Sequence, residues 1–331
     1  FYGSQKELDL SLNNESPLWE TGINSYISQS FFNRSRFNAT DFGGTLALTY
    51  HGQRTDLGLK TSAAKETVRT TETTNFGQNL GAAQEVNYDI QPSFDYHIGQ
   101  RTHFLLSGRY INTSYDDSRL IDYQETALTP SFAYDITETH RAALSLQYGY
   151  FRADNDDRTR INTLSPFADL TWSPNKRWST LLCAGANISK ERSHSLSDDD
   201  WQRDMIYEAS LRFKGETNKT ELRIVRQNQI YTDGNQSLLT SFILETSHKL
   251  NENLTLDGYA SHQTSGASGR SSLEHKTKAS IGLTYQLFQT VALRGSYEYK
   301  IETYNDNSPH VQGNKALLSL LWHPFETEET P

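Results

Sequence analysis

The chain has 331 residues, of which 35% are hydrophobic, 21% charged and 11% aromatic, and its formal net charge is -9. A mean hydropathy of -0.69 and the lack of an apolar run of about 20 residues exclude a bundle of membrane-spanning helices. The negative charge argues against nucleic acid as a partner, and the single cysteine, Cys183, excludes a disulfide framework and a multi-thiolate metal site.

The N-terminal part of the chain predicts one strand followed by a long connection. Leu8, Leu10 and Leu12 alternate with polar residues, which is typical of a strand with one apolar face. Residues 16–41 are expected to form a long first extracellular loop, although residues 25–30 fit an extra strand or part of a hairpin within it. Because the chain opens at Phe1 and not at a methionine, we expect that the start codon is missing and that any signal peptide has been removed or left out of this sequence.

Further along the chain, apolar and polar side chains alternate with a period of two. Between residues 291 and 302, Val291, Leu293 and Tyr297 fall on one face and charged side chains fall on the other. The same alternation is present in segments 88–97, 104–111, 142–150, 254–259 and 278–287. No comparable segment has helical spacing, so the whole chain is interpreted as strands of about 10–14 residues.

The connections between these strands alternate in length. Short turns are expected at 52–54, 99–101, 137–139, 173–175, 215–217, 251–253 and 288–289. Longer polar connections are expected at 70–84, 115–122, 153–160, 193–203, 232–236, 265–275 and 305–314. Short turns at one edge and long loops at the other are typical of outer-membrane barrels.

The predicted fold is therefore all-β: one transmembrane antiparallel up-and-down β-barrel over residues 1–331, integral to a bacterial outer membrane. About 16 strands are expected, a count that could differ by two, and residues 326–331 are expected to form a periplasmic tail. A large soluble β-sandwich is the competing interpretation, because its core would use the same alternation.

A weak repeat accompanies the hairpins. Pro92-Ser93-Phe94 is echoed at Pro130 and again at Pro166, with a period of about 37 residues. Proline lacks the N–H that a ladder needs, so each proline is expected at a bulge or at an unpaired position.

Aromatic residues near both ends of the apolar face are expected to form two girdles at the membrane interfaces. The girdle residues are Tyr50, Tyr96, Tyr134, Trp172, Trp178, Tyr285, Trp322, Tyr110, Tyr148, Tyr297 and Tyr299.

The opposite face is expected to line the lumen. Its candidate residues are Lys60, Asp95, Arg109, Arg212, Lys214, Glu221, Arg223, Asp257, Arg294, Glu298, Lys300 and Glu302. Two interpretations of these charges stay open. They form cross-strand ion pairs that hydrate the wall, or they line a pathway that selects charged or hydroxylated solutes.

Motifs for catalysis and for metal binding are missing from the sequence. No nucleophile elbow, phosphate loop or His-Glu-x-x-His motif is present, and no two of the ten histidines have ligand spacing. The expectation is a protein that is not an enzyme, with no cofactor and no metal site. Acidic runs such as 154–157 are expected to be solvated in external loops; the alternative is that divalent cations bridge them to lipopolysaccharide.

Two stretches carry a resemblance to a known family: Thr129 to Leu146, which includes Pro130-Ser131-Phe132, and the similar stretch Gln91 to Tyr110. They resemble a family of β-barrel porins found in bacterial surface-polysaccharide loci, including outer-membrane proteins associated with exosortase systems. The likeness spans about residues 84–190. It implies an outer-membrane pore associated with exopolysaccharide secretion and transfers no functional residue.

The leading functional hypothesis is a non-enzymatic outer-membrane channel that passes surface polysaccharide or other hydrophilic solutes. Inward-facing Tyr259 and Phe167 are weak candidates for stacking on sugar rings. The alternatives are a general diffusion porin, a structural barrel around a periplasmic or electron-transfer protein, and an adhesin or receptor. The expected partners are outer-membrane lipid, lipopolysaccharide, polysaccharide and a periplasmic export or partner protein.

Overall fold

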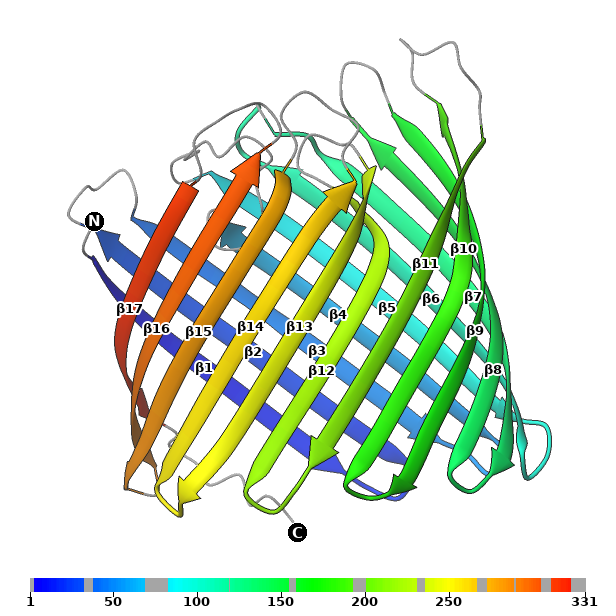
Figure 1. Ribbon diagram of the computed structural model, residues 1–331, viewed down its shortest axis with the longest axis horizontal. Coiled ribbons are helices and arrows are strands. Elements are labelled where there is room, and N and C mark those ends of the chain that lie inside the picture. The colour runs from blue at the N-terminus through cyan, green and yellow to red at the C-terminus, as the bar shows by residue number, and fades with distance from the viewer. Residues whose placement is uncertain are drawn as a thin grey trace. The chain divides into compact units, whose positions relative to one another are not determined.

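The computed structural model describes residues 3–32, 38–68, 83–118, 120–154, 159–192, 201–230, 236–266, 273–288, 290–304 and 311–322. Its regular structure consists of seventeen β-strands that belong to one antiparallel sheet (Figure 1). No helix within these ranges is long and apolar enough to cross a membrane. The predicted tail, residues 326–331, lies outside the described residues.

The strands are 12 to 16 residues long, above the mode of about 5–6 for globular proteins. They are β1 (Gly3–Glu15), β2 (Trp19–Phe32), β3 (Ala39–His51), β4 (Thr55–Thr67), β5 (Gln84–His97), β6 (Thr102–Tyr115), β7 (Tyr123–Thr137), β8 (His140–Ala153), β9 (Arg160–Asn175), β10 (Trp178–Arg192), β11 (Trp201–Lys214), β12 (Asn218–Ile230), β13 (Gln236–Asn251), β14 (Leu254–Gly266), β15 (Leu273–Phe288), β16 (Val291–Tyr304) and β17 (Val311–Trp322).

The chain forms two compact units. Unit 1 contains Phe1–Asp169, Ala184–Met205 and Ile230–Gln236, and unit 2 contains Leu170–Cys183, Ile206–Gln229 and Ser237–Pro331. In unit 1, each strand from β1 to β8 pairs with the next one along the chain. In unit 2, β11 pairs with β12, and β13 to β17 pair in sequence order.

The predicted long first loop at 16–41 is wrong, because residues 19–32 form β2. This strand pairs with β1 from Glu15↔Glu20 to Gly3↔Phe32, so β1 starts at the edge of the long connections. The apolar face of β2 carries large side chains only at every fourth residue: Trp19, Ile23, Ile27 and Phe31. Thr21, Ser25 and Gln29 lie between them on the same face. Because polar residues occupy half of the positions on this face, the alternation of apolar and polar residues is not evident in the sequence.

Large apolar side chains lie exposed on one face of the sheet. Leu144 is 67% exposed, Leu318 74% and Leu320 68%, whereas the core of a soluble sandwich would bury such residues. The buried apolar side chains of the described residues include only two small clusters, around Val68 and around Phe151. A broad exposed apolar surface is typical of a protein that meets lipid.

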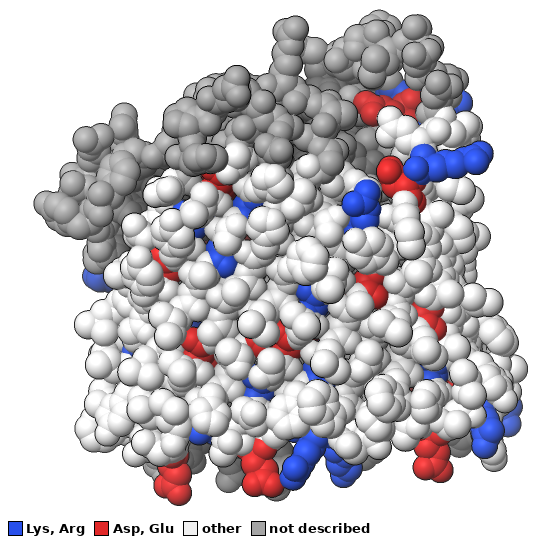
Figure 2. Space-filling view, in the orientation of Figure 1, with Lys and Arg blue, Asp and Glu red and all other residues white. Residues whose placement is uncertain are grey.

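Charges are sparse over the apolar surface. In the view of Figure 2, uncharged residues cover most of the face, small areas of Lys, Arg, Asp and Glu are scattered across its middle, and larger charged groups project at its lower edge and upper right. Within unit 2, the apolar surface includes Phe242, Leu244, Ile281, Leu283 and Leu293, each more than one-third exposed.

Two of the repeated prolines interrupt a ladder. The β5–β6 pairing passes from Ile90↔Tyr110 to Ser93↔Ser107 and skips Pro92. The β7–β8 pairing passes from Leu128↔Tyr148 to Ser131↔Ser145 and skips Pro130. Both prolines keep their place in the ladder to the preceding strand. The expectation of unpaired positions is therefore confirmed for these two prolines, whose missing N–H faces the following strand.

Near Pro166, the third proline of the repeat, β9 and β10 approach so closely that only glycine fits at position 185. A Cβ there would overlap the carbonyl oxygen of Pro166 and would lie 2.5 Å from Cβ of Phe167. We therefore expect Gly185→Ala to destabilise the protein by about 1–3 kcal/mol, because strand backbone must move. Urea unfolding of the protein in detergent micelles, followed by tryptophan fluorescence, measures this loss.

Gly295→Ala is the matched control, since a Cβ at position 295 in β16 meets nothing within 4 Å. We expect that variant to stay within about 0.5 kcal/mol of the parent protein. Equal unfolding midpoints for the two variants would contradict the close approach of β9 and β10.

Candidate functional site

The face of the sheet opposite the exposed apolar side chains is polar and charged, and we call it the polar face. Strand alternation puts every predicted lumen residue there: Lys60, Asp95, Arg109, Arg212, Lys214, Glu221, Arg223, Asp257, Arg294, Glu298, Lys300 and Glu302. Apart from Trp322, whose side chain lies outside the described part of the structure, the predicted aromatic girdle residues occupy the other face by the same alternation.

On the polar face of unit 2, β11 and β12 carry two crossed arginine–glutamate pairs. Arg212 donates to both carboxylate oxygens of Glu221, at 2.8 and 3.1 Å. Arg223 of β12 donates in the opposite direction to Glu208 of β11, at 2.8 Å. Bidentate pairing fixes the orientation of the arginine and the glutamate, and the opposite charges of the two side chains largely compensate each other. These four charged residues of β11 and β12 therefore form an ion-pair network.

A second network on the polar face of unit 2 joins β15 and β16. The ammonium nitrogen of Lys278 lies 3.0 Å from Glu298. Glu302 contacts two lysines, Lys300 at 3.0 Å and Lys276 at 3.5 Å, and its side chain is only 7% exposed. Lys276 and Lys278 were not among the predicted site residues. The register between β15 and β16 puts Lys276 directly opposite Glu302. This register cannot be inferred from the alternation within a single strand, so the two lysines were missed.

Other polar-face groups of unit 2 lie beside these pairs. The ammonium of Lys278 lies 5.6 Å from the ring centroid of Tyr259, close enough for a cation–π contact. Gly282 leaves space that Arg294 uses: a Cβ at position 282 would lie 3.7 Å from the Arg294 guanidinium and 3.7 Å from Cβ of Asp257. Arg294 and Asp257 are thus neighbours across the glycine.

Unit 1 has a polar concavity of about 480 Å³ on its polar face, over β3 to β8. Two predicted lumen residues, Lys60 and Arg109, line it, with hydroxyl and amide side chains between them: Thr49, Gln91, Ser93, Ser107, Thr129 and Gln147. Arg109 donates to Asp89 at 3.1 Å, and Gln91 donates to the same oxygen at 2.9 Å. Lys60 is exposed and makes no ion pair with another described residue, so its charge is available to a solute.

At the short-turn edge of unit 1, histidines and carboxylates form a continuous row across seven strands, which we call the short-turn belt. Its members, from β2 to β8, are Glu20, His51, Asp56, Asp95, His97, His103, Asp135 and Arg141. Neighbouring members lie between 3.0 and 3.8 Å apart, except that His97 and His103 meet through their rings, at a centroid distance of 4.5 Å.

The short-turn belt includes a group that sequence analysis missed. Asp95, His97 and His103 can each offer one ligand atom, and these atoms lie within 4.8 Å of one another. The sequence was expected to contain no metal site, because no histidine pair was recognised at ligand spacing. The signal was a hairpin pattern: Asp95 and His97 are two apart on β5, and His103 is the register partner of His97 on β6.

Aromatic side chains lie at the short-turn edge of the apolar face in both units. In unit 1, the rings of Trp19 and Tyr50 lie 4.9 Å apart, and in unit 2 those of Trp178 and Phe213 lie 4.6 Å apart. Trp19 falls on the strand that was predicted as loop, so it was missing from the predicted girdle.

Comparison with protein families agrees with this geometry. Residues 203–322, which are 120 of the 331 residues, match the family described as "Putative beta-barrel porin 2". This segment is similar to that family of β-barrel porins. The resemblance inferred from the sequence is confirmed at the level of the family, although the matched segment lies beyond residues 84–190. A search of curated proteins found no match.

Solved structures share the fold at low sequence identity. The FrpB iron transporter from Neisseria meningitidis (F5-1 variant) aligns with a TM-score of 0.53 and 6% identity, over 93% of this chain and 63% of that one. BauA, the ferric preacinetobactin receptor from Acinetobacter baumannii, aligns with a TM-score of 0.51 and 9% identity, over 96% of this chain and 71% of that one. The siderophore receptor PiuA from Acinetobacter baumannii aligns with a TM-score of 0.50 and 10% identity, over 95% and 64% of the two chains.

The chain thus spans less than two-thirds of the length of FrpB and PiuA. Together, the match to the porin family and these neighbours support the fold of an outer-membrane β-barrel. At such low sequence identities, the structural similarity shows the fold and gives no information about the substrate.

The unequal burial of two glutamates on β16 predicts unequal costs of neutralising them. Glu302→Gln removes the carboxylate that Lys276 and Lys300 share, at a side chain that is only 7% exposed. We expect this change to lower the free energy of unfolding by about 3 kcal/mol. Glu298→Gln removes the ion pair with Lys278, whose two side chains are 34–35% exposed. We expect the free energy of unfolding to fall by less than about 1 kcal/mol. Urea unfolding in micelles compares the two variants, and equal losses would contradict the difference in burial.

Proposed function

We propose that the chain is a non-enzymatic outer-membrane channel whose polar face lines the pathway of a hydrophilic solute. The observation that carries this proposal is the division of the sheet into an exposed apolar face and a polar face with a 480 Å³ concavity. An apolar face in contact with lipid leaves only the polar face for water and solute.

The chemistry of the concavity supports a polyhydroxylated solute. Hydroxyl and amide groups donate and accept hydrogen bonds in turn, as sugar hydroxyls do, and they recur on every strand from β5 to β8. Lys60 adds a positive charge without an ion-pair partner among the described residues, which favours carboxylated or sulfated sugars. Surface polysaccharide is therefore the proposed cargo, in agreement with the surface-polysaccharide loci of the family that the sequence resembles.

A general diffusion porin is the second candidate. The ion pairs of unit 2 favour it, because Arg212, Glu221, Arg223 and Glu208 present both signs of charge within one small area. A wall of paired charges hydrates a pore without selecting one solute. The two candidates differ in whether a sugar polymer resides in the pore long enough to block current.

Single-channel recording in planar bilayers tests the proposal with the full chain. We expect a stable ohmic conductance that acidic oligosaccharides block at lower concentration than neutral ones. We further expect Lys60→Gln to weaken block by the acidic oligosaccharide by about fivefold or more, because one hydrogen bond to a charged group is lost. Lys176→Gln is the matched control, since Lys176 is an exposed lysine in the turn between β9 and β10 and is not part of the concavity.

Each outcome separates the candidates. Conductance without oligosaccharide block would favour the diffusion porin over polysaccharide passage. A folded protein that conducts no current would overturn the free-channel proposal and favour a barrel that encloses a partner protein. If Lys60→Gln and Lys176→Gln changed block by the acidic oligosaccharide equally, the concavity would not be part of the solute pathway.

A further inference from the structure

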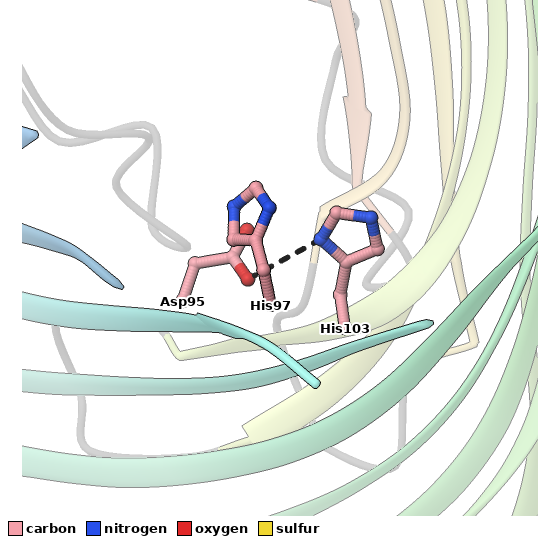
Figure 3. Close-up of side chains that lie close together, drawn as sticks. All are labelled: Asp95, His97 and His103. Carbon is pink, nitrogen blue, oxygen red and sulfur yellow. Dashed lines mark ion pairs between the residues drawn. The ribbon is translucent and has the colours of Figure 1, made fainter. Parts of the chain in front are cut away.

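We propose that Asp95, His97 and His103 bind one divalent transition-metal ion at the short-turn edge of unit 1. Figure 3 shows the three side chains rising from neighbouring strands toward one another. Two imidazoles and one carboxylate are a ligand set that Zn²⁺ and its neighbours in the first transition row accept. Channel activity does not require this site, so the proposal goes beyond the proposed function.

The decisive contact is between two buried acceptor atoms. Nδ1 of His103 lies 3.6 Å from Oδ1 of Asp95, and neither atom has a hydrogen-bond partner. His103 is 8% exposed, so water does not readily compensate for the missing bond. At 3.6 Å the two atoms are too far apart for a hydrogen bond, but they suit a shared ion. Two ligands of a tetrahedral ion with bonds of about 2.0–2.1 Å lie about 3.4 Å apart.

The other ring nitrogen of His103 fixes the tautomer that a metal needs. Nε2 lies 3.1 Å from Oδ2 of Asp135, the geometry of an N–H that donates to a carboxylate. A neutral imidazole that donates through Nε2 presents a lone pair on Nδ1, and this lone pair faces Asp95. Histidine ligands in metal sites are commonly oriented by a carboxylate on the far nitrogen. Asp135 is thus a positioning residue.

His97 completes the set from the same hairpin. Its ring meets the ring of His103 edge-on, at 4.5 Å between centroids and an interplanar angle of 61°. All three ligand atoms lie within 4.8 Å of one another, so the widest pair closes by about 1.4 Å at most when an ion binds at tetrahedral distances. Three protein ligands leave at least one coordination position for water or for another ligand, as in open zinc sites.

Zinc titration of the full chain tests the proposal. The protein is purified without a histidine tag, stripped with EDTA in detergent micelles and titrated with Zn²⁺ by calorimetry, and Co²⁺ is used as an absorbance probe of coordination. We expect one ion per chain. Asp95→Asn and His97→Gln keep the shape of the side chains, and each is expected to weaken binding by tenfold or more.

His51→Gln is the matched control, because His51 belongs to the short-turn belt but is not one of the three ligands. We expect this variant to bind Zn²⁺ as the parent chain does. Heat-modified migration on gels shows that each variant is folded. Failure to bind one equivalent of Zn²⁺ would overturn the proposal and leave His103 and Asp95 as an ion pair. An equal loss in His51→Gln would overturn it as well, because binding would then be a property of surface histidines.

Discussion

The structure depends on the need to pair every backbone N–H and C=O that crosses a membrane. Hydrocarbon offers these groups no partner, so strands satisfy them only through ladders with their neighbours. Extended strands then send successive side chains to opposite faces, and the sequence supplies apolar residues for one and polar residues for the other. The prolines fit the same constraint: Pro92 and Pro130 have no N–H to donate, and each faces an interruption in the ladder on one side only.

The polar face of each unit handles charge differently. In unit 2, arginines and lysines are paired with glutamates, and Glu302 is nearly buried between two lysines. In unit 1, the concavity has hydroxyl and amide side chains among apolar residues, and Lys60 stands without an ion-pair partner among the described residues. Paired charges hydrate a wall and hold strands together, whereas an accessible charge among neutral polar groups can meet a solute. Both interpretations of the charged face therefore find support, each in its own unit.

The sequence was sufficient to predict a strand wherever apolar and polar residues alternate clearly within that strand. The alternation in 291–302 predicts β16, and the prolines predict where ladders are interrupted. It failed where the signal is diluted or shared between strands. β2 places a large apolar side chain at every fourth residue only, so it was assigned to a loop. The contact of Lys276 with Glu302 depends on register. The approach of His103 to Asp95 depends on how the 98–101 turn aligns two strands, which single-strand periodicity does not contain.

The alternation of connection lengths has a consequence for how the chain enters the membrane. In each unit, the long polar connections all leave from one edge, and the short turns all lie at the other. Only the edge with long connections must be carried through the hydrocarbon during insertion; the short-turn edge can stay in water throughout. The charges of the short-turn belt, from Glu20 to Arg141, therefore never undergo the desolvation that crossing a bilayer imposes on ions. Insertion from one side thus lets this row of titratable groups form at no electrostatic cost to membrane entry.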